Sequence, residues 1–128
     1  MILLVQFMGA LYGMLAVLFG AFGAHTLKKT LSEDQLKSFE TGVKYQMYHA
    51  ILLVIIGYNF NFITSLETNI AYCFIIGTFL FSFSIYDLSI SASKNKKLSI
   101  LGPITPIGGL FLVAGWGLLL YFYIKDIF

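Results

Sequence analysis

The sequence predicts an all-α integral membrane protein: a four-helix bundle with a short interfacial amphipathic helix between spans 1 and 2. The first observation is composition, because 59% of the 128 residues are hydrophobic and 11% are charged, against roughly 25% charge in soluble domains. The second is that several apolar runs reach the roughly 20 residues that cross a bilayer. The third is a polar segment between the first two runs with the pattern of an interfacial helix. The length predicts one domain, 1–128.

The first apolar run predicts a transmembrane helix over residues 2–24. It lacks a basic leading segment, so we expect a retained span and not a cleaved signal peptide. Small residues recur on one face of this helix at spacings of three and four, which lets another backbone approach closely. The stripe therefore predicts a packing face, with a second copy of the chain as one candidate partner. Its residues are Gly9, Gly13, Ala16, Gly20 and Gly23.

The segment 32–43 predicts the interfacial amphipathic helix. Ser32 and Gln35 stand at the spacing of a capping box, which satisfies the first amide groups of a helix. An apolar stripe then runs along one side, with lysine, serine and threonine on the other. Gly42 allows a bend before the chain enters the bilayer.

Three further spans are predicted over residues 44–62, 69–90 and 103–123. The third predicted span is unusual because serines, a tyrosine and an aspartate interrupt its second half. The fourth begins with Pro103 and Pro106, which suit a helix start because the missing amide groups would have no partner there.

The distribution of lysine predicts the orientation. Four spans place seven of the eight lysines on one side of the membrane, and only Lys125 on the other. The positive-inside rule then puts both termini outside the cytoplasm of a cell (plasma) membrane, with both basic loops in the cytoplasm. The basic loops contain Lys28, Lys29, Lys37, Lys44, Lys94, Lys96 and Lys97.

Four motifs in order along the chain resemble the bacterial YwdK/YgdD-type family. They are GAFGAH from Gly20 followed by LKK, FETGVKYQMYHA from Phe39, FSFS-x-Y from Phe81, and GPITPIGGL with AGW from Gly102. This family consists of small four-span membrane proteins classed as a domain of unknown function, with distant mitochondrial relatives in eukaryotes. The resemblance implies a four-helix membrane protein and no established activity. Asp87 stands where we expect the family to have an apolar residue, so a mechanism shared by the family cannot depend on it.

The polar residues near the predicted cytoplasmic side form a candidate vestibule. His25 and His49 lie toward this side of neighbouring spans, where they could form a metal or haem-iron site or a proton-titrating pair. The plainer interpretation, which the sequence favours, is that each imidazole hydrogen-bonds a helix end or a tyrosine. Asp87 is either solvated at the membrane edge or functional, because ionisable groups within spans are costly. The candidate vestibule comprises His25, His49, Tyr45, Tyr86 and Asp87.

Several function classes are disfavoured by composition. The net charge of +2 is too small to indicate nucleic-acid binding, and the chain has no arginine to clamp a phosphate. We find no nucleophile–base motif and no cluster with metal-ligand spacing, so we expect no enzyme, no catalytic residue, no metal and no cofactor. The expected partner is the lipid bilayer. The sequence therefore favours a non-enzymatic packing or interaction protein of the cell membrane. A small ion- or proton-coupled carrier and a haem- or metal-binding protein are the alternatives.

Overall fold

A computed structural model describes residues 1–94 and 101–128, and the regular structure in those two ranges is entirely helical. Lys96 and Lys97 of the predicted basic loop lie outside the described residues. The elements in order are α1 (Ile2–His25), η1 (Leu27–Lys29), α2 (Glu33–Asn59), α3 (Ser65–Thr78), η2 (Phe79–Phe83), α4 (Ser84–Ser93) and α5 (Ile104–Ile124).

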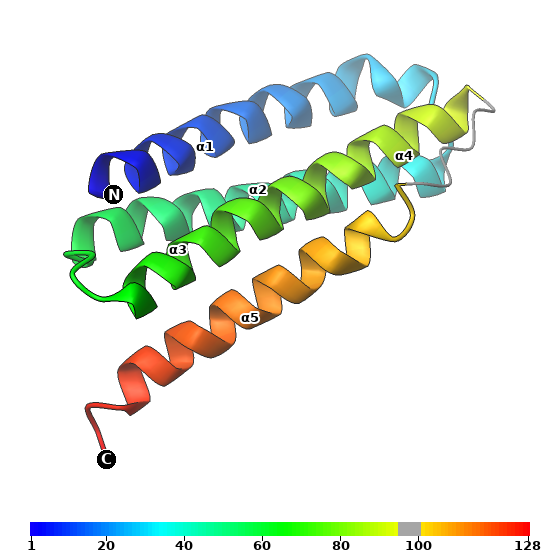
Figure 1. Cartoon of the computed structure of the whole chain (residues 1–128). Coiled ribbons are helices and arrows are strands. Elements are labelled where there is room, and N and C mark those ends of the chain that lie inside the picture. The colour runs from blue at the N-terminus through cyan, green and yellow to red at the C-terminus, as the bar shows by residue number, and fades with distance from the viewer. Residues whose placement is uncertain (95–100) are drawn as a thin grey trace.

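The helices form long rods that alternate in direction. The elements α3, η2 and α4 follow one another without interruption and count as one rod. Figure 1 shows both termini and the α2–α3 connection at one end, and the α1–α2 connection, the end of α4 and the start of α5 at the other. The second end carries Lys28, Lys29 and Lys94 and is called the basic end below. The rods pack chiefly as α1 on α2 and α3 on α5, while α2 also contacts α4.

Helix α2 is continuous where the sequence predicts two separate helices, an interfacial one over 32–43 and a span over 44–62. The predicted capping box is present, because Gln35 N–H donates to Ser32 Oγ and Ser32 N–H donates to Gln35 Oε1. The chain does not bend at Gly42. A Cβ on Gly42 would lie only 2.7 Å from the Tyr86 ring, so this glycine is required for packing inside a straight helix.

The apolar stripe of the predicted interfacial helix packs on protein. Phe39 is buried with Leu27, Leu31 and Tyr86 in a small cluster at the basic end. This contact explains why the helix continues straight into the bundle: its apolar side is covered by η1 and α4. Among the described residues, three segments are both long and apolar enough to cross a membrane, namely Ile2–Lys29, Ser65–Ser93 and Ile104–Ile124. The more polar α2 does not meet that criterion.

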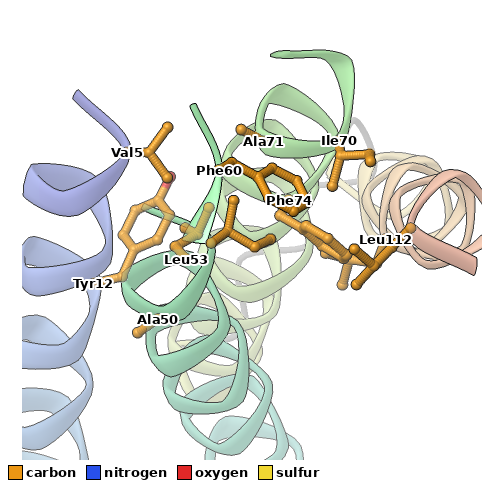
Figure 2. Packing of buried hydrophobic residues seen from close by; sticks show 11 residues of the cluster. Val5, Tyr12, Ala50, Leu53, Phe60, Ile70, Ala71, Phe74 and Leu112 are labelled. Atoms are coloured by element: carbon orange, nitrogen blue, oxygen red, sulfur yellow. The ribbon is translucent and has the colours of Figure 1, made fainter. Parts of the chain in front are cut away.

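The main core lies in the other half of the bundle and is built from all four rods. Leu53 lies on α2, and Phe60 directly follows its last residue. Both pack with Val5 of α1, Phe74 of α3 and Leu112 of α5. Figure 2 shows these side chains converging between the helices. Many large apolar side chains point outward instead, including Leu3, Leu110 and Val113, each more than 60% exposed. An apolar exterior around a packed interior is typical of a bundle in lipid.

The glycine stripe of α1 packs against α2 of the same chain. A Cβ on Gly9 would lie 2.8 Å from Val54, and one on Gly23 would lie 2.9 Å from Phe39. Ala16, on the same face, is buried. Part of this face therefore packs inside the chain, at Gly9, Ala16 and Gly23.

Helix α5 comes very close to the backbone of another helix at Gly108. A Cβ on Gly108 would lie 2.4 Å from Phe81 N, within the segment η2. That segment, Phe79–Phe83, is a π-helix turn inside an otherwise α-helical rod. Such turns are rare and are often found at functional sites. Glycine at position 108 therefore lets α5 lie directly against the π turn.

Candidate functional site

A line of buried polar side chains runs between α2 and the α3–η2–α4 rod. We call Gln46, His49, Ser82 and Tyr86 the polar seam. Each is at most 5% exposed. Because a polar group in an apolar interior is costly without a partner, the hydrogen bonds of the seam define what it can do.

Gln46 links three of the rods at the centre of the seam. Its Nε2 donates to the backbone carbonyl of Tyr12 on α1 over 2.8 Å. Its Oε1 accepts from the Tyr86 hydroxyl on α4 over 2.7 Å. Tyr12 itself donates through its hydroxyl to Ile75 O on α3 over 2.9 Å. These bonds tie α1, α2 and the α3–η2–α4 rod together within the apolar interior.

Ser82 adds a further link from the π turn. Its hydroxyl donates to the Gly42 carbonyl of α2 over 2.8 Å. Thr78, one residue before the π turn, is fully buried, and its Oγ1 has no hydrogen-bond partner among the described residues.

His49 is held by both of its ring nitrogens. The Trp116 indole N–H of α5 donates to His49 Nε2 over 3.2 Å, so Nε2 is an acceptor. Nδ1 lies 2.7 Å from Tyr45 O, and a carbonyl can only accept, so Nδ1 carries the hydrogen. The network therefore assigns a neutral imidazole with its hydrogen on Nδ1. Trp116 is 51% exposed, so it lies at the bundle surface while its indole N–H points to His49.

The structure does not assemble the predicted vestibule. His49 and Tyr86 are buried, but His25 and Asp87 are exposed and Tyr45 is 42% exposed. His25 follows Gly23, which packs beside Phe39, while His49 lies at the level of Gly13, whose built Cβ is 3.8 Å from Ala50. At ~1.5 Å rise per residue, the two histidines are roughly 15–18 Å apart along the bundle. A site shared by the two histidines is therefore excluded.

The described residues contain no group of three or more histidine, cysteine, aspartate or glutamate side chains that could hold a metal ion. In His49, both nitrogens already have partners within the protein. Coordination of a metal or haem iron by this ring would require the bond to Trp116 to be broken.

An open groove of about 530 Å³ lies at the basic end. The starts of α2 and α5 and the last turns of α4 form its walls, with both apolar and polar side chains. Its lining residues are Asp34, Gln35, Ser38, Ile85, Leu88, Ser89, Ala92, Gly102, Thr105 and Pro106. We call this the basic-end groove. None of the five predicted vestibule residues lines it, although it lies at the predicted side.

Sequence reasoning missed the central role of Gln46 and the role of Glu67. Glu67 is buried, and one carboxylate oxygen accepts from Ile63 N, Thr64 N and Thr64 Oγ1, each over 3.0 Å. These bonds close the α2–α3 connection and cap α3. The spacing of Thr64 and Glu67 is that of a capping box, so this signal was available. For Gln46, the available signal was an amide one helical turn from a histidine on the apolar side of α2.

Comparison with known proteins gives a consistent family. A family model described as "Protein of unknown function (DUF423)" matches residues 19–109. A UPF0382 membrane protein of Staphylococcus haemolyticus is 43% identical over 114 residues, covering 88% of each chain. UPF0382 membrane protein YwdK of Bacillus subtilis is 37% identical over 111 residues, covering 85% of this chain and 86% of YwdK.

A eukaryotic relative is similar over a comparable length. A UPF0382 membrane protein of Schizosaccharomyces pombe is 37% identical over 112 residues, covering 87% of this chain and 93% of its own. No solved structure matches the chain. The family model extends over the seam, the π turn and the start of α5, and these relatives confirm the resemblance carried by the GAFGAH and TPIGG motifs. The chain belongs to the DUF423 family, whose relatives are small UPF0382 membrane proteins.

Proposed function

We propose that this protein is a non-enzymatic bundle of four transmembrane helices. Its role in the cell membrane is to pack its helices together and to interact with partner molecules. The observation that carries the proposal is the pair of hydrogen bonds made by the Gln46 side chain, which joins α1, α2 and α4 inside the apolar interior. Helices in lipid gain little from the hydrophobic effect, so close packing and interhelical hydrogen bonds hold them together. A seam whose donors and acceptors are used between helices is suited to fixing the bundle.

The proposal includes α2 as the fourth span. It is 27 residues long, or about 40 Å at ~1.5 Å per residue, against a hydrocarbon core of roughly 30 Å. Its polar residues Gln46 and His49 are buried against the other rods, so they need not contact lipid. Low hydropathy in a helix whose polar side is covered is compatible with a span. We further propose that the basic end faces the cytoplasm, because the positive-inside rule favours that orientation.

Orientation and transport are tested separately. A reporter active only in the cytoplasm, fused after Phe128, should give no signal, and a strong signal would overturn the orientation. For transport, the rival is a proton-coupled carrier that uses the seam. Liposomes with a trapped pH-sensitive dye should keep an imposed pH gradient as long with the protein as without it. Faster decay with wild-type protein, restored to the empty-liposome rate by Gln46→Leu, would favour the carrier instead.

A further inference from the structure

One wall of the basic-end groove carries a serine hydroxyl that has no hydrogen-bond partner among the described residues. Ser89 lines the groove, is 5% exposed as a residue, and its hydroxyl makes no hydrogen bond to any residue in 1–94 or 101–128. The neighbouring hydroxyls of α4 differ: Ser84 bonds Phe81 O and Thr105, and Ser93 bonds Ile90 O. A serine hydroxyl on a helix ordinarily finds such a partner when it is buried. The Ser89 hydroxyl is therefore available to a molecule in the groove.

A second donor comes from the start of α5, which forms another wall of the groove. This helix has no side-chain cap at its first turn, and Thr105 N–H has no hydrogen-bond partner within the described residues. In the described part of the chain, Thr105 N–H is the one free amide group in this first turn, because Pro106 has no N–H and the amides of Ile104 and Ile107 bond Leu101 O and Pro103 O. The helix dipole adds a partial positive charge there. Together with Ser89, this wall offers donors to an anionic group such as a phosphate or carboxylate.

The start of α2 forms a further wall of the groove and carries a negative charge at Asp34. Asp34, in the first turn of α2, lines the groove and forms no hydrogen bond or ion pair with the described residues. It can therefore accept from an ammonium group. Ile85, Leu88, Ala92 and Pro106 complete the groove with apolar surface. The volume of about 530 Å³ falls within the roughly 300–1,000 Å³ of sites for small molecules.

We propose that the basic-end groove binds a phospholipid with a primary-amine zwitterionic headgroup, such as phosphatidylethanolamine. Its ammonium group lies at Asp34, its phosphate at Ser89 and the start of α5, and its glycerol and upper acyl chains along the apolar walls. The choice of a lipid over a soluble zwitterion follows from those walls and from the position of the groove at one end of an apolar bundle. The proposal rests on the membrane location of the bundle in the proposed function, but not on which side the basic end faces.

Native mass spectrometry of the purified full chain in detergent tests this directly. The probes are phosphatidylethanolamine, phosphatidylcholine and phosphatidylglycerol of identical acyl chains. We expect the wild type to retain phosphatidylethanolamine at least tenfold better than the other two. Asp34→Asn and Ser89→Ala should each reduce that preference at least fivefold. Glu33→Gln and Ser91→Ala are matched controls, because each residue is next in sequence to one that lines the groove but does not line it itself.

Two results would overturn the binding proposal, and a third would overturn the choice of a lipid. Equal retention of the three lipids, or a preference that survives both Asp34→Asn and Ser89→Ala, would overturn the proposal. Displacement of phosphatidylethanolamine by free phosphoethanolamine at equal concentration would overturn the lipid assignment, because the apolar walls would then contribute nothing. Circular dichroism of each variant shows whether it is folded. Ala92→Cys, at a groove position with no assigned contact to the headgroup, reacts with a methanethiosulfonate reagent in a Cys73→Ser background and gives a second readout. Bound lipid should slow that reaction when Asp34 is present and not when Asp34→Asn is added. Failure of the orientation test would leave these results unchanged, so the two claims fail separately.

Discussion

The Tyr86 hydroxyl donates to Gln46 Oε1 over 2.7 Å, and both side chains are buried where α4 crosses α2. The same amide group donates from Nε2 to the Tyr12 carbonyl of α1. One glutamine thus uses both ends of its side chain to connect different helices. In an interior that excludes water, loss of either partner leaves a polar atom without a replacement.

Tyr86→Phe should destabilise the bundle by about 1–2 kcal/mol, because it removes the donor and leaves Gln46 Oε1 buried and unpaired. Unfolding in sodium dodecyl sulfate can be followed through Trp116, the single tryptophan. Tyr58→Phe is the matched control, since Tyr58 is 78% exposed and its hydroxyl has no partner in the described part of the chain. Equal stability of both variants would mean that the Gln46–Tyr86 bond contributes nothing.

Gly108→Ala should disrupt the contact between α5 and the π turn. Its Cβ would lie 2.4 Å from Phe81 N, and backbone atoms cannot move aside as a flexible side chain can. We expect a loss of about 1–3 kcal/mol, as for other overpacked sites, measured as a lower melting temperature in detergent. Gly117→Ala, on the same helix, has nothing within 4 Å of its Cβ and should be neutral or slightly stabilising. The reverse order of the two variants would refute this account of the α5 interface.

The two histidines should behave differently. His49→Ala removes a buried ring and its hydrogen bonds to Trp116 and Tyr45 O, so it should cost about 1–3 kcal/mol. It should also change the emission spectrum of Trp116, whose indole N–H loses its partner. His25→Ala, at an exposed helix end, should alter neither stability nor emission. If His25→Ala changed the Trp116 spectrum as strongly, the two residues would be coupled, contrary to their separation in the structure.

Much of the fold is predictable from the sequence because lipid imposes simple rules. The helical class, the long apolar segments and the capping box at Ser32 follow from apolar run length and from local hydrogen-bonding patterns. The predicted break near Gly42 was wrong because local sequence does not reveal what a glycine packs against. In the structure, the ring of Tyr86, a residue forty-four positions later in the chain, occupies the space beside Gly42.

The candidate site was predictable only in part, for a related reason. Sequence reasoning selected His49 and Tyr86, which belong to the seam, but grouped them with His25 and Asp87, which are exposed. Membership of one site depends on helix rotation and vertical register, and both are set by contacts between helices. The glycine stripe of α1 shows the same limit: its packing role was predictable, but its partner, α2, was not.

The account depends most on α2 crossing the membrane as the fourth span. Cysteine accessibility tests this in a Cys73→Ser background, which removes the single native cysteine. The test positions are exposed at opposite ends: Asn61 and Asp126 at one end, Lys29 and Lys94 at the basic end. A membrane-impermeant maleimide should label Asn61→Cys and Asp126→Cys on intact cells, but Lys29→Cys and Lys94→Cys only after permeabilisation. Labelling of Asn61→Cys on the same side as Lys29→Cys would contradict the account, because α2 would then begin and end on one side of the membrane.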